Sequence, residues 1–356
     1  MKNHVVWVNP DFKTPFGFQK GQPSSLGLLL SLNYKEGPDF FLGVQRGHFR
    51  SSIVGQFVIK DRKERAYSEV SLKGSGLLAE EEKTSMPNKS LIAKQWHIKT
   101  KAGEPTAEVR GLLDFDAAHH DAIHAEKFTR LGIETHRVLA IIVFEELNIG
   151  SERVSVEECK EKGLLFNFRP VVQVRVFRTN QRLHDIIQEE NENSETRKNR
   201  ILEIIRSLWS KESVYLKEQI LVPNYLVWLT QAVASHVGRM HKHRYLHRWL
   251  NPHNITLDGC LVDFDGVERM GVFCNLSGSY TREIRRDAWT DCYWSDGAGG
   301  GFKQTGKAGA LESLQDFQQS LQRLFPEISA LAEVDVATMF KERYESVGGY
   351  RGMIPL

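Results

Sequence analysis

The segment from His247 to Gly266 constrains the fold of this chain more than any other stretch of its sequence. It reads HRWLNPHN, then ITLDGCLV, then DFDG, which predicts a loop, two short strands joined by a glycine turn, and an acidic turn. Asn254 and Asp263 would face each other across the base of that hairpin. An amide oxygen and a carboxylate placed in this way are hard oxygen ligands that suit Mg²⁺. Phosphoryl chemistry uses such a metal to neutralise the charge of the phosphates.

The sequence before this segment favours strands. Runs of β-branched and aromatic residues, together with alternating valines, predict strands at 40–44, 52–59, 66–72, 91–98, 138–144 and 172–176. One helix is expected over 116–131 and is ended by Gly132. The rest of the charged stretch from 79 to 110 reads as loop, and the polar residues 188–200 read as a solvated loop or the start of a helix.

The second half of the chain favours helices. Apolar residues repeat at helical spacing from Leu226 to Met240 and again from Leu311 to Leu324. A strand-rich part followed by a helix-rich part is typical of an α+β protein. We therefore expect a bilobed α+β fold in which residues 1–150 form a strand-rich lobe and residues 151–356 form a mostly helical lobe.

Composition limits the class of protein. The 356 residues are 41% hydrophobic and 26% charged, so the chain can bury a core. A net charge of +2 argues against a dedicated nucleic-acid binder. The N-terminus lacks an apolar secretory segment, and no window of about 18 apolar residues occurs, so no membrane span is expected. Four scattered cysteines argue against a disulfide scaffold or a cysteine zinc site and favour a cytoplasmic protein.

The segment at 247–266 resembles the catalytic loop and metal-binding turn of protein kinases. His247, Arg248, Leu250 and Asn254 match H-R-D-L-x-x-x-N, and Asp263-Phe264 match the start of D-F-G. The resemblance implies a protein kinase-like bilobed fold that binds ATP and Mg²⁺. The chain departs from this pattern at Trp249, which replaces the kinase base aspartate. Indole cannot accept a proton as a carboxylate does.

A second set of motifs, in matching order, extends over roughly residues 66–280. These motifs are Leu72-Lys73-Gly74-Ser75-Gly76, the run from Ala125 to Ala140, Arg175 with Arg182, the residues His247, Asn251 and Asn254, and Phe273–Ser277. Together they resemble the selenoprotein O family, whose kinase-like members transfer AMP to protein hydroxyls. This chain would be a divergent and shorter member.

The resemblance implies roles for individual residues. Lys73 and Gly74 would contact the nucleotide phosphates, and Arg175 and Arg182 would hold phosphate groups. Asn254 and Asp263 would bind the metal, for which Mn²⁺ is an alternative to Mg²⁺.

Three positions depart from the pattern of that family. The aspartate before the metal-binding asparagine, proposed there as a base, is His253 here, and histidine can accept a proton near neutral pH. Asp265 is an alternative base. The glutamate that pairs with the nucleotide lysine aligns with Asp121, and Glu126 is a rival for that role. The chain ends in Gly-Met-Ile-Pro-Leu without a redox cysteine, so the redox-linked role of the family does not carry over.

These observations lead to a functional hypothesis with two alternatives. The chain is expected to be an ATP-dependent transferase that moves AMP to a hydroxyl of a protein or peptide. The first alternative is a phosphotransferase acting on a small molecule or peptide. The second is an inactive ATP-binding pseudokinase module, which Trp249 favours and the retained Lys73, Asn254 and Asp263 oppose. No nucleic-acid or membrane partner is expected.

Two other motifs carry less weight. The run GFKQTGKA at 301–308 fits G-x-x-x-x-G-K, but Ala308 lacks the hydroxyl that a P-loop presents to Mg²⁺. His241, His243 and His247 have no well-placed acidic or sulfur partner for a zinc ion. His247 is better explained as a packed histidine of the catalytic loop.

Overall fold

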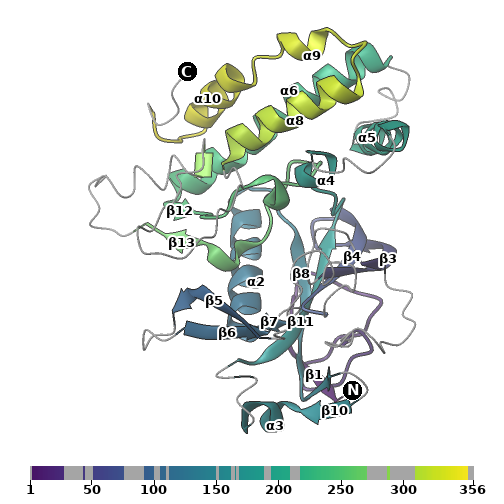
Figure 1. The fold of residues 1–356 in the computed structure, drawn as a ribbon, viewed down its shortest axis with the longest axis vertical. Coiled ribbons are helices and arrows are strands. Elements are labelled where there is room, and N and C mark those ends of the chain that lie inside the picture. Colours follow the sequence, from purple (N-terminus) through teal and green to yellow (C-terminus); the bar gives the residue numbers. More distant parts are fainter. Residues whose placement is uncertain are drawn as a thin grey trace. The chain divides into compact units, whose positions relative to one another are not determined.

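The computed structural model divides the chain into two compact units. Unit 1 comprises Met1–Ile123 and His136–Arg178, and unit 2 comprises His124–Thr135 and Thr179–Leu356. Unit 1 is built on a mostly antiparallel sheet and unit 2 on helices, which confirms the predicted α+β fold with a strand-rich first part and a mostly helical second part (Figure 1). The structure describes residues 2–27, 43–44, 51–75, 92–99, 105–109, 112–149, 152–161, 165, 168–187, 194–208, 217–270, 287–288 and 309–351.

Unit 1 is organised by a seven-stranded sheet with the strand order β1-β8-β11-β4-β3-β2, in which β7 also pairs with β11. Its strands are β1 (Asn3–Val8), β2 (Gly43–Val44), β3 (Ser51–Lys60), β4 (Ala66–Lys73), β7 (Leu113–Asp114), β8 (Arg137–Phe144) and β11 (Pro170–Phe177). Separate two-stranded ribbons are formed by β5 (Ile92–Lys99) with β6 (Pro105–Val109) and by β9 (Glu146–Ile149) with β10 (Glu152–Ser155), which leads into α3 (Val156–Glu161). The strand β6 lies in a stretch predicted to be loop.

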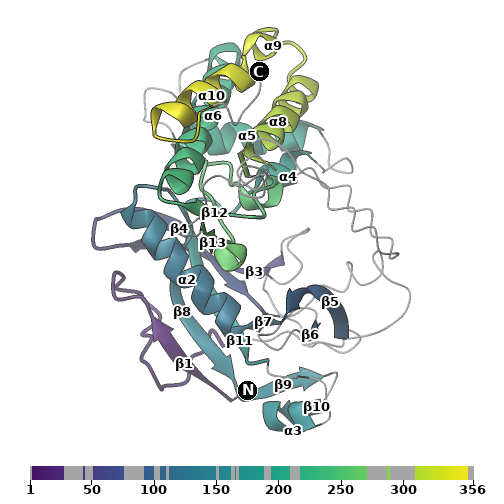
Figure 2. The same cartoon turned by 90° about the vertical axis from the view of Figure 1, so that its left-hand side faces the viewer.

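The central strands β8 and β11 are buried along their whole length. One face of the sheet packs into an apolar cluster that includes Leu72, Ile142 and Val174. The other face meets helix α2 (Phe115–Arg130) through Ala118 and Ala122 (Figure 2). A sheet covered on both faces buries every residue of its central strands, which is why the valines of β11 do not alternate with exposed side chains.

The sequence predicts a division at residue 150, but the two units of the structure divide at other positions. Strand β11 pairs with both β8 and β4, so the chain up to Arg178 belongs with unit 1. Residues 124–135 belong with unit 2. The predicted boundary was wrong because strand pairing joins segments that are distant along the chain.

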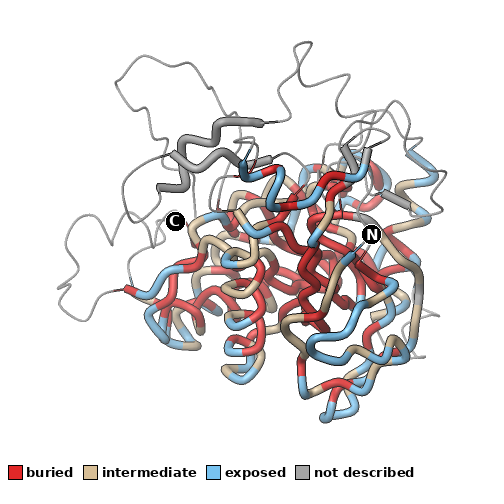
Figure 3. The backbone as a smooth tube through the Cα atoms, turned by 90° about the horizontal axis from the view of Figure 1, so that it is seen from below, coloured by how far each residue is buried: buried red, intermediate tan, exposed pale blue. Residues whose placement is uncertain are grey.

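Unit 2 is built from helices that pack around α6. The helices are α4 (Leu183–Ile187), α5 (Ser194–Leu208), α6 (Glu218–Lys242), α8 (Ala310–Leu324), α9 (Ala330–Glu333) and α10 (Val336–Ser346). The apolar faces predicted from Leu226 to Met240 and from Leu311 to Leu324 are buried in one core, which confirms both helices. Figure 3 colours the described backbone by how far each residue is buried. Within the described residues, no helix has the length and apolar character needed to cross a membrane.

The segment between α6 and α8 supplies the candidate site. It contains a short ribbon of β12 (Tyr245–Leu246) and β13 (Glu268–Arg269) and two 3-10 helices, η3 (Pro252–Asn254) and η4 (Phe264–Gly266). An isolated bridge joins Ile255 to Leu261, which forms the hairpin that the sequence predicts between the two 3-10 helices.

Candidate functional site

His247 is a packed histidine at the start of the loop in unit 2. Its side chain is fully buried, and Nε2 lies 2.9 Å from the carbonyl oxygen of Val262. Burial lowers the pKa of His247, against the opposing influence of Asp287, the Val262 carbonyl, Asp263 and Asp265. A neutral imidazole with its proton on Nε2 donates to Val262. His247 is therefore accounted for by packing, as expected from the sequence.

Asp287 holds the backbone at the start of this loop. Its Oδ2 accepts the N–H of His247, and its Oδ1 accepts the N–H of Arg248 at 2.8 Å. Arg248 has a φ of 72°, and the left-handed region costs a residue of this kind about 1 kcal/mol. The two hydrogen bonds to a buried carboxylate offset that cost. Sequence reasoning missed Asp287 because no local pattern marks it, and it lies 40 residues beyond His247.

The side chain of Asn254 is fixed by its nitrogen. Its Nδ2 donates to the carbonyl oxygen of Trp249 at 2.6 Å. The backbone of Asn254 is bonded on both sides, because its N–H donates to the Asn251 carbonyl at 2.9 Å and its own carbonyl accepts from Val262 at 3.1 Å. None of the hydrogen bonds found among the described residues uses Oδ1 of Asn254, so the arrangement leaves this oxygen as the donor atom for a cation.

Asp263 follows directly from this pairing. Because Val262 donates to the carbonyl of Asn254, the structure brings Asn254 and Asp263 together at the base of the hairpin, as predicted. Asp263 has a left-handed backbone, with φ 63° and ψ 70°, and is partly exposed. The next residue, Phe264, is fully buried against His247, with ring centroids 5.4 Å apart. The buried ring anchors the turn that presents the Asp263 carboxylate.

His253, a predicted base, lies within the same loop and stacks on another histidine. The rings of His253 and His184 have centroids 3.4 Å apart and an interplanar angle of 30°. The backbone of His253 is held at both polar groups, by Asn251 Oδ1 at 3.0 Å and by Arg182 Nη1 at 2.7 Å. His184 comes from α4 and was not anticipated from the sequence. Asp265, the alternative base, lies in η4 and is partly exposed.

Arg182 is a predicted phosphate ligand whose hydrogen bonds brace the loop. The side chain is fully buried and donates from Nη1 to the carbonyl of His253 at 2.7 Å. Its Nε and Nη2 donate to the carbonyl and the side-chain oxygen of Asn180, each at 3.1 Å. The contact with phosphate stays a prediction, and the structure adds a bracing role.

Lys73 is the last residue of β4 in unit 1. It is 4% exposed and lies in register with Gln173 on β11 and Ser51 on β3. The following Gly74 has a φ of +94°, and a Cβ there would lie 2.5 Å from the carbonyl oxygen of Val171. Packing of the sheet therefore requires glycine at 74 whether or not a phosphate binds there.

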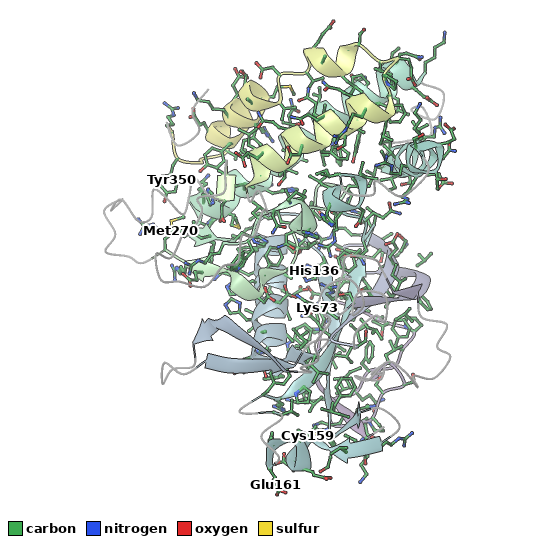
Figure 4. The ribbon with its side chains drawn as sticks, in the orientation of Figure 1. Lys73, His136, Cys159, Glu161, Met270 and Tyr350 are labelled. Carbon is green, nitrogen blue, oxygen red and sulfur yellow. The ribbon has the colours of Figure 1, made fainter. Side chains whose placement is uncertain are left out.

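A buried polar cluster in unit 1 includes Gln173, the residue of β11 that lies in register with Lys73. Oδ2 of Asp121 lies 2.9 Å from His136 Nε2 and accepts from Gln173 Nε2 at 2.9 Å (Figure 4 labels Lys73 and His136). Sequence reasoning selected Asp121 but missed His136 and Gln173. Glu126, the rival acid, is buried in α2 but belongs to unit 2. Pairing of either acid with the lysine stays a prediction.

Arg175 lies on the same face of β11 as Gln173, two residues further along. It is 1% exposed, its Nη2 donates to Ser51 Oγ at 3.0 Å, and its guanidinium lies over the ring of Phe177, 5.2 Å from the centroid. The structure thus places the two predicted phosphate arginines in different units, Arg175 in unit 1 and Arg182 in unit 2.

The donor set in unit 2 fits magnesium better than a soft metal. In the described part of the chain, no group of three or more His, Cys, Asp or Glu side chains could hold a metal ion. Mg²⁺ takes one or two protein oxygens and completes its shell with phosphates and water. Asn254 and Asp263 match that requirement. The P-loop-like run at 301–308 and the motif at 273–277 lie outside the described residues.

Comparisons with known proteins give one kind of likeness. No family model matches the chain, and no curated protein matches its sequence. Among solved structures, the chain is similar to one described as a Toxoplasma gondii specific rhoptry antigen kinase domain. The identity is 9% and the TM-score 0.36, over 88% of this chain and 76% of that one. With a TM-score below 0.5, this likeness carries no argument about the fold or the activity of this chain. The more specific resemblance to the selenoprotein O family stays a prediction.

The burial of His247 makes a testable prediction about its charge. Its pKa should lie below the ordinary value of about 6.5. The imidazole should therefore be more than half neutral at pH 6.5, and its contribution to stability should be lost as the pH falls from there through the folded-state pKa. NMR titration of the ring proton, assigned with His247→Gln, measures this. A midpoint at or above 6.5 would contradict the assignment.

Proposed function

We propose that this chain is an ATP- and Mg²⁺-dependent transferase of the kinase-like type. The observation that carries the proposal is the backbone hydrogen bond from Val262 to Asn254 in unit 2, which brings Asp263 next to Asn254 in the hairpin. The amide of Asn254 is fixed through its nitrogen on the Trp249 carbonyl, and its backbone carbonyl is bonded to the residue before Asp263. These bonds support a site in which the amide oxygen of Asn254 and the carboxylate of Asp263 would lie at one end of the hairpin.

The chemistry that this arrangement favours is stabilisation of phosphate charge. Asn254 and Asp263 would hold Mg²⁺, which would neutralise the negative charge of the nucleotide phosphates during transfer. The residues of the chain itself orient these groups. Because Asp287 and Arg182 hold the loop backbone, the ligands need little rearrangement when the metal nucleotide binds.

His253 is the base that we favour for the acceptor hydroxyl. A neutral imidazole can take the hydroxyl proton, while the acceptor oxygen forms a bond to the α-phosphorus of ATP and pyrophosphate leaves with the electron pair of the broken bond. The backbone N–H and carbonyl of His253 are both hydrogen-bonded, which fixes the position from which its side chain extends. Asp265 is the alternative base. Transfer of AMP rather than phosphate rests on the sequence motifs.

One observation favours a second candidate, a module that binds ATP without turnover. Trp249 stands where kinases have their base, and its indole is 45% exposed. The ring lies against the acidic turn, since a Cβ at Gly266 would be 2.6 Å from Trp249 Cδ1. This arrangement supplies no proton acceptor at that position.

Transfer of separately labelled phosphates tests the proposal. The purified protein is incubated with Mg²⁺, a lysate and ATP labelled at either the α- or the γ-phosphate. We expect the α-label to be transferred. Asp263→Ala should lower the rate of transfer at least about a hundredfold, and it should weaken the Mg²⁺-dependent affinity for ATP, measured by thermal stabilisation, by a similar factor. Glu342→Ala, an exposed acid on α10, is the matched control.

The outcomes separate the candidates. Movement of the γ-label alone would replace AMP transfer with phosphotransfer. Stabilisation by ATP and Mg²⁺ with no movement of either label would favour the binding module. Full activity of Asp263→Ala would contradict the metal assignment itself.

A second prediction concerns Lys73 in unit 1. Lys73→Ala should lower transfer by about a hundredfold while the melting temperature changes little, because a phosphate contact matters more for transfer than for folding. Lys73→Arg, which keeps the charge, should retain part of the activity. Lys60→Ala, an exposed lysine on the neighbouring strand β3, should behave as wild type. Unfolding of Lys73→Ala would show instead that the lysine is structural.

A further inference from the structure

A series of hydrogen bonds, buried except at Tyr350, links the residues after α10 to the candidate loop. The backbone N–H of Tyr350 donates to Tyr344 Oη at 3.3 Å. Tyr344 Oη lies 2.9 Å from Nδ1 of His241 in α6, and Nε2 of the same imidazole lies 3.4 Å from Asp287 Oδ2. Asp287 in turn accepts the N–H groups of the loop, as described above. The series therefore connects residue 350 with the backbone at residue 248.

The donors and acceptors of these hydrogen bonds are compatible with one consistent direction. The Asp287 carboxylate only accepts, so the imidazole of His241 presents its proton from Nε2. In the neutral form of the imidazole, Nδ1 is then an acceptor, and the hydroxyl of Tyr344 donates to it. The oxygen of that hydroxyl remains as the acceptor for Tyr350 N–H. All of these groups are satisfied in one polarity, and Tyr344, His241 and Asp287 are each at most 1% exposed.

Packing contacts also join the residues after α10 to the start of the loop. A Cβ at Gly349 would lie 2.5 Å from the ring of Tyr344, so the absence of a side chain there lets the backbone approach the hydroxyl. The ring of Tyr350 packs against Leu246 and Met270 (Figure 4 labels Met270 and Tyr350). Leu246 belongs to β12 and immediately precedes His247.

We infer that Tyr344 and Tyr350 are positioning residues for the loop at 247–254. Asp287 accepts the N–H of Arg248, whose backbone is left-handed. His241 contacts the same carboxylate, and Tyr344 holds His241 from its other ring nitrogen. The segment after α10 thus helps to set the geometry of the Trp249 carbonyl, to which Asn254 is bonded. The effect on transfer rests on the proposed function, whereas the effect on the loop does not.

Hydrogen exchange of single amides tests the ordering of the loop. Tyr344→Phe removes one hydroxyl and keeps the ring, and we expect the amides of His247 and Arg248 to exchange about five- to tenfold faster, in line with the loss of one buried hydrogen bond. Interior amides of α6 and the melting temperature should change little. A general loss of stability would instead accelerate exchange throughout unit 2.

Tyr225→Phe is the matched control. Tyr225 is as deeply buried in unit 2, but its hydroxyl donates to the carbonyl of Leu257 at 2.6 Å and not to His241. It should leave the exchange of the His247 and Arg248 amides unchanged. Equal acceleration in both variants, or none in Tyr344→Phe, would overturn the inference.

A kinetic readout adds the functional consequence. Tyr344→Phe and Tyr350→Ala should each lower kcat for transfer about fivefold and leave the KM for ATP unchanged, because these tyrosines are proposed to position the loop and not to bind the nucleotide. Unchanged kcat in both variants would overturn the functional part of the inference. If the wild-type protein transfers neither label, the proposed function has failed, and the exchange experiment still decides whether these tyrosines order the loop.

Discussion

The acceptance of two successive backbone N–H groups by the Asp287 carboxylate is the interaction on which the candidate site depends. A buried carboxylate is costly unless its oxygens accept hydrogen bonds, and Asp287 takes them from His247 and Arg248. The same bonds hold Arg248 in a left-handed conformation that it would otherwise leave. The path of the chain from this point determines where Trp249 places its carbonyl, and that carbonyl fixes the amide of Asn254. The position of Asn254, a proposed metal ligand, therefore depends on a carboxylate that is not itself proposed as a ligand.

Both units contain a buried, hydrogen-bonded polar group next to a residue with a proposed function. In unit 2, Arg182 places its guanidinium under the carbonyl of His253. In unit 1, Asp121 holds Gln173, which lies in register with Lys73. Removing one member of such a network destabilises the fold, because the remaining polar groups stay buried without a hydrogen-bond partner. They fix side chains before a ligand arrives, which is the condition for charge stabilisation without rearrangement.

The parts of this structure that could be predicted from the sequence are those set by short-range patterns. The apolar face of α6 follows from helical spacing, and the closeness of Asn254 to Asp263 follows from a hairpin of only a few residues. Contacts between distant segments leave no such pattern. Asp287 and His184 were missed for that reason, and the boundary at residue 150 was wrong because β11 pairs back into the sheet of unit 1. Gly74 was selected as part of a nucleotide motif, yet close packing against β11 is a sufficient reason for glycine there.

The central claim is that the loop between α6 and β13 binds a metal nucleotide through Asn254 and Asp263. Paramagnetic broadening by Mn²⁺ with ATP, followed on the backbone amide resonances of the isotopically labelled protein, tests this without requiring an acceptor or turnover. The account predicts that within unit 2 the amides next to Asn254 and Asp263 broaden first, at Mn²⁺ concentrations that leave those of α10 sharp, and that Asp263→Asn removes the effect. Broadening in unit 2 that begins elsewhere, or that persists unchanged in Asp263→Asn, would contradict it.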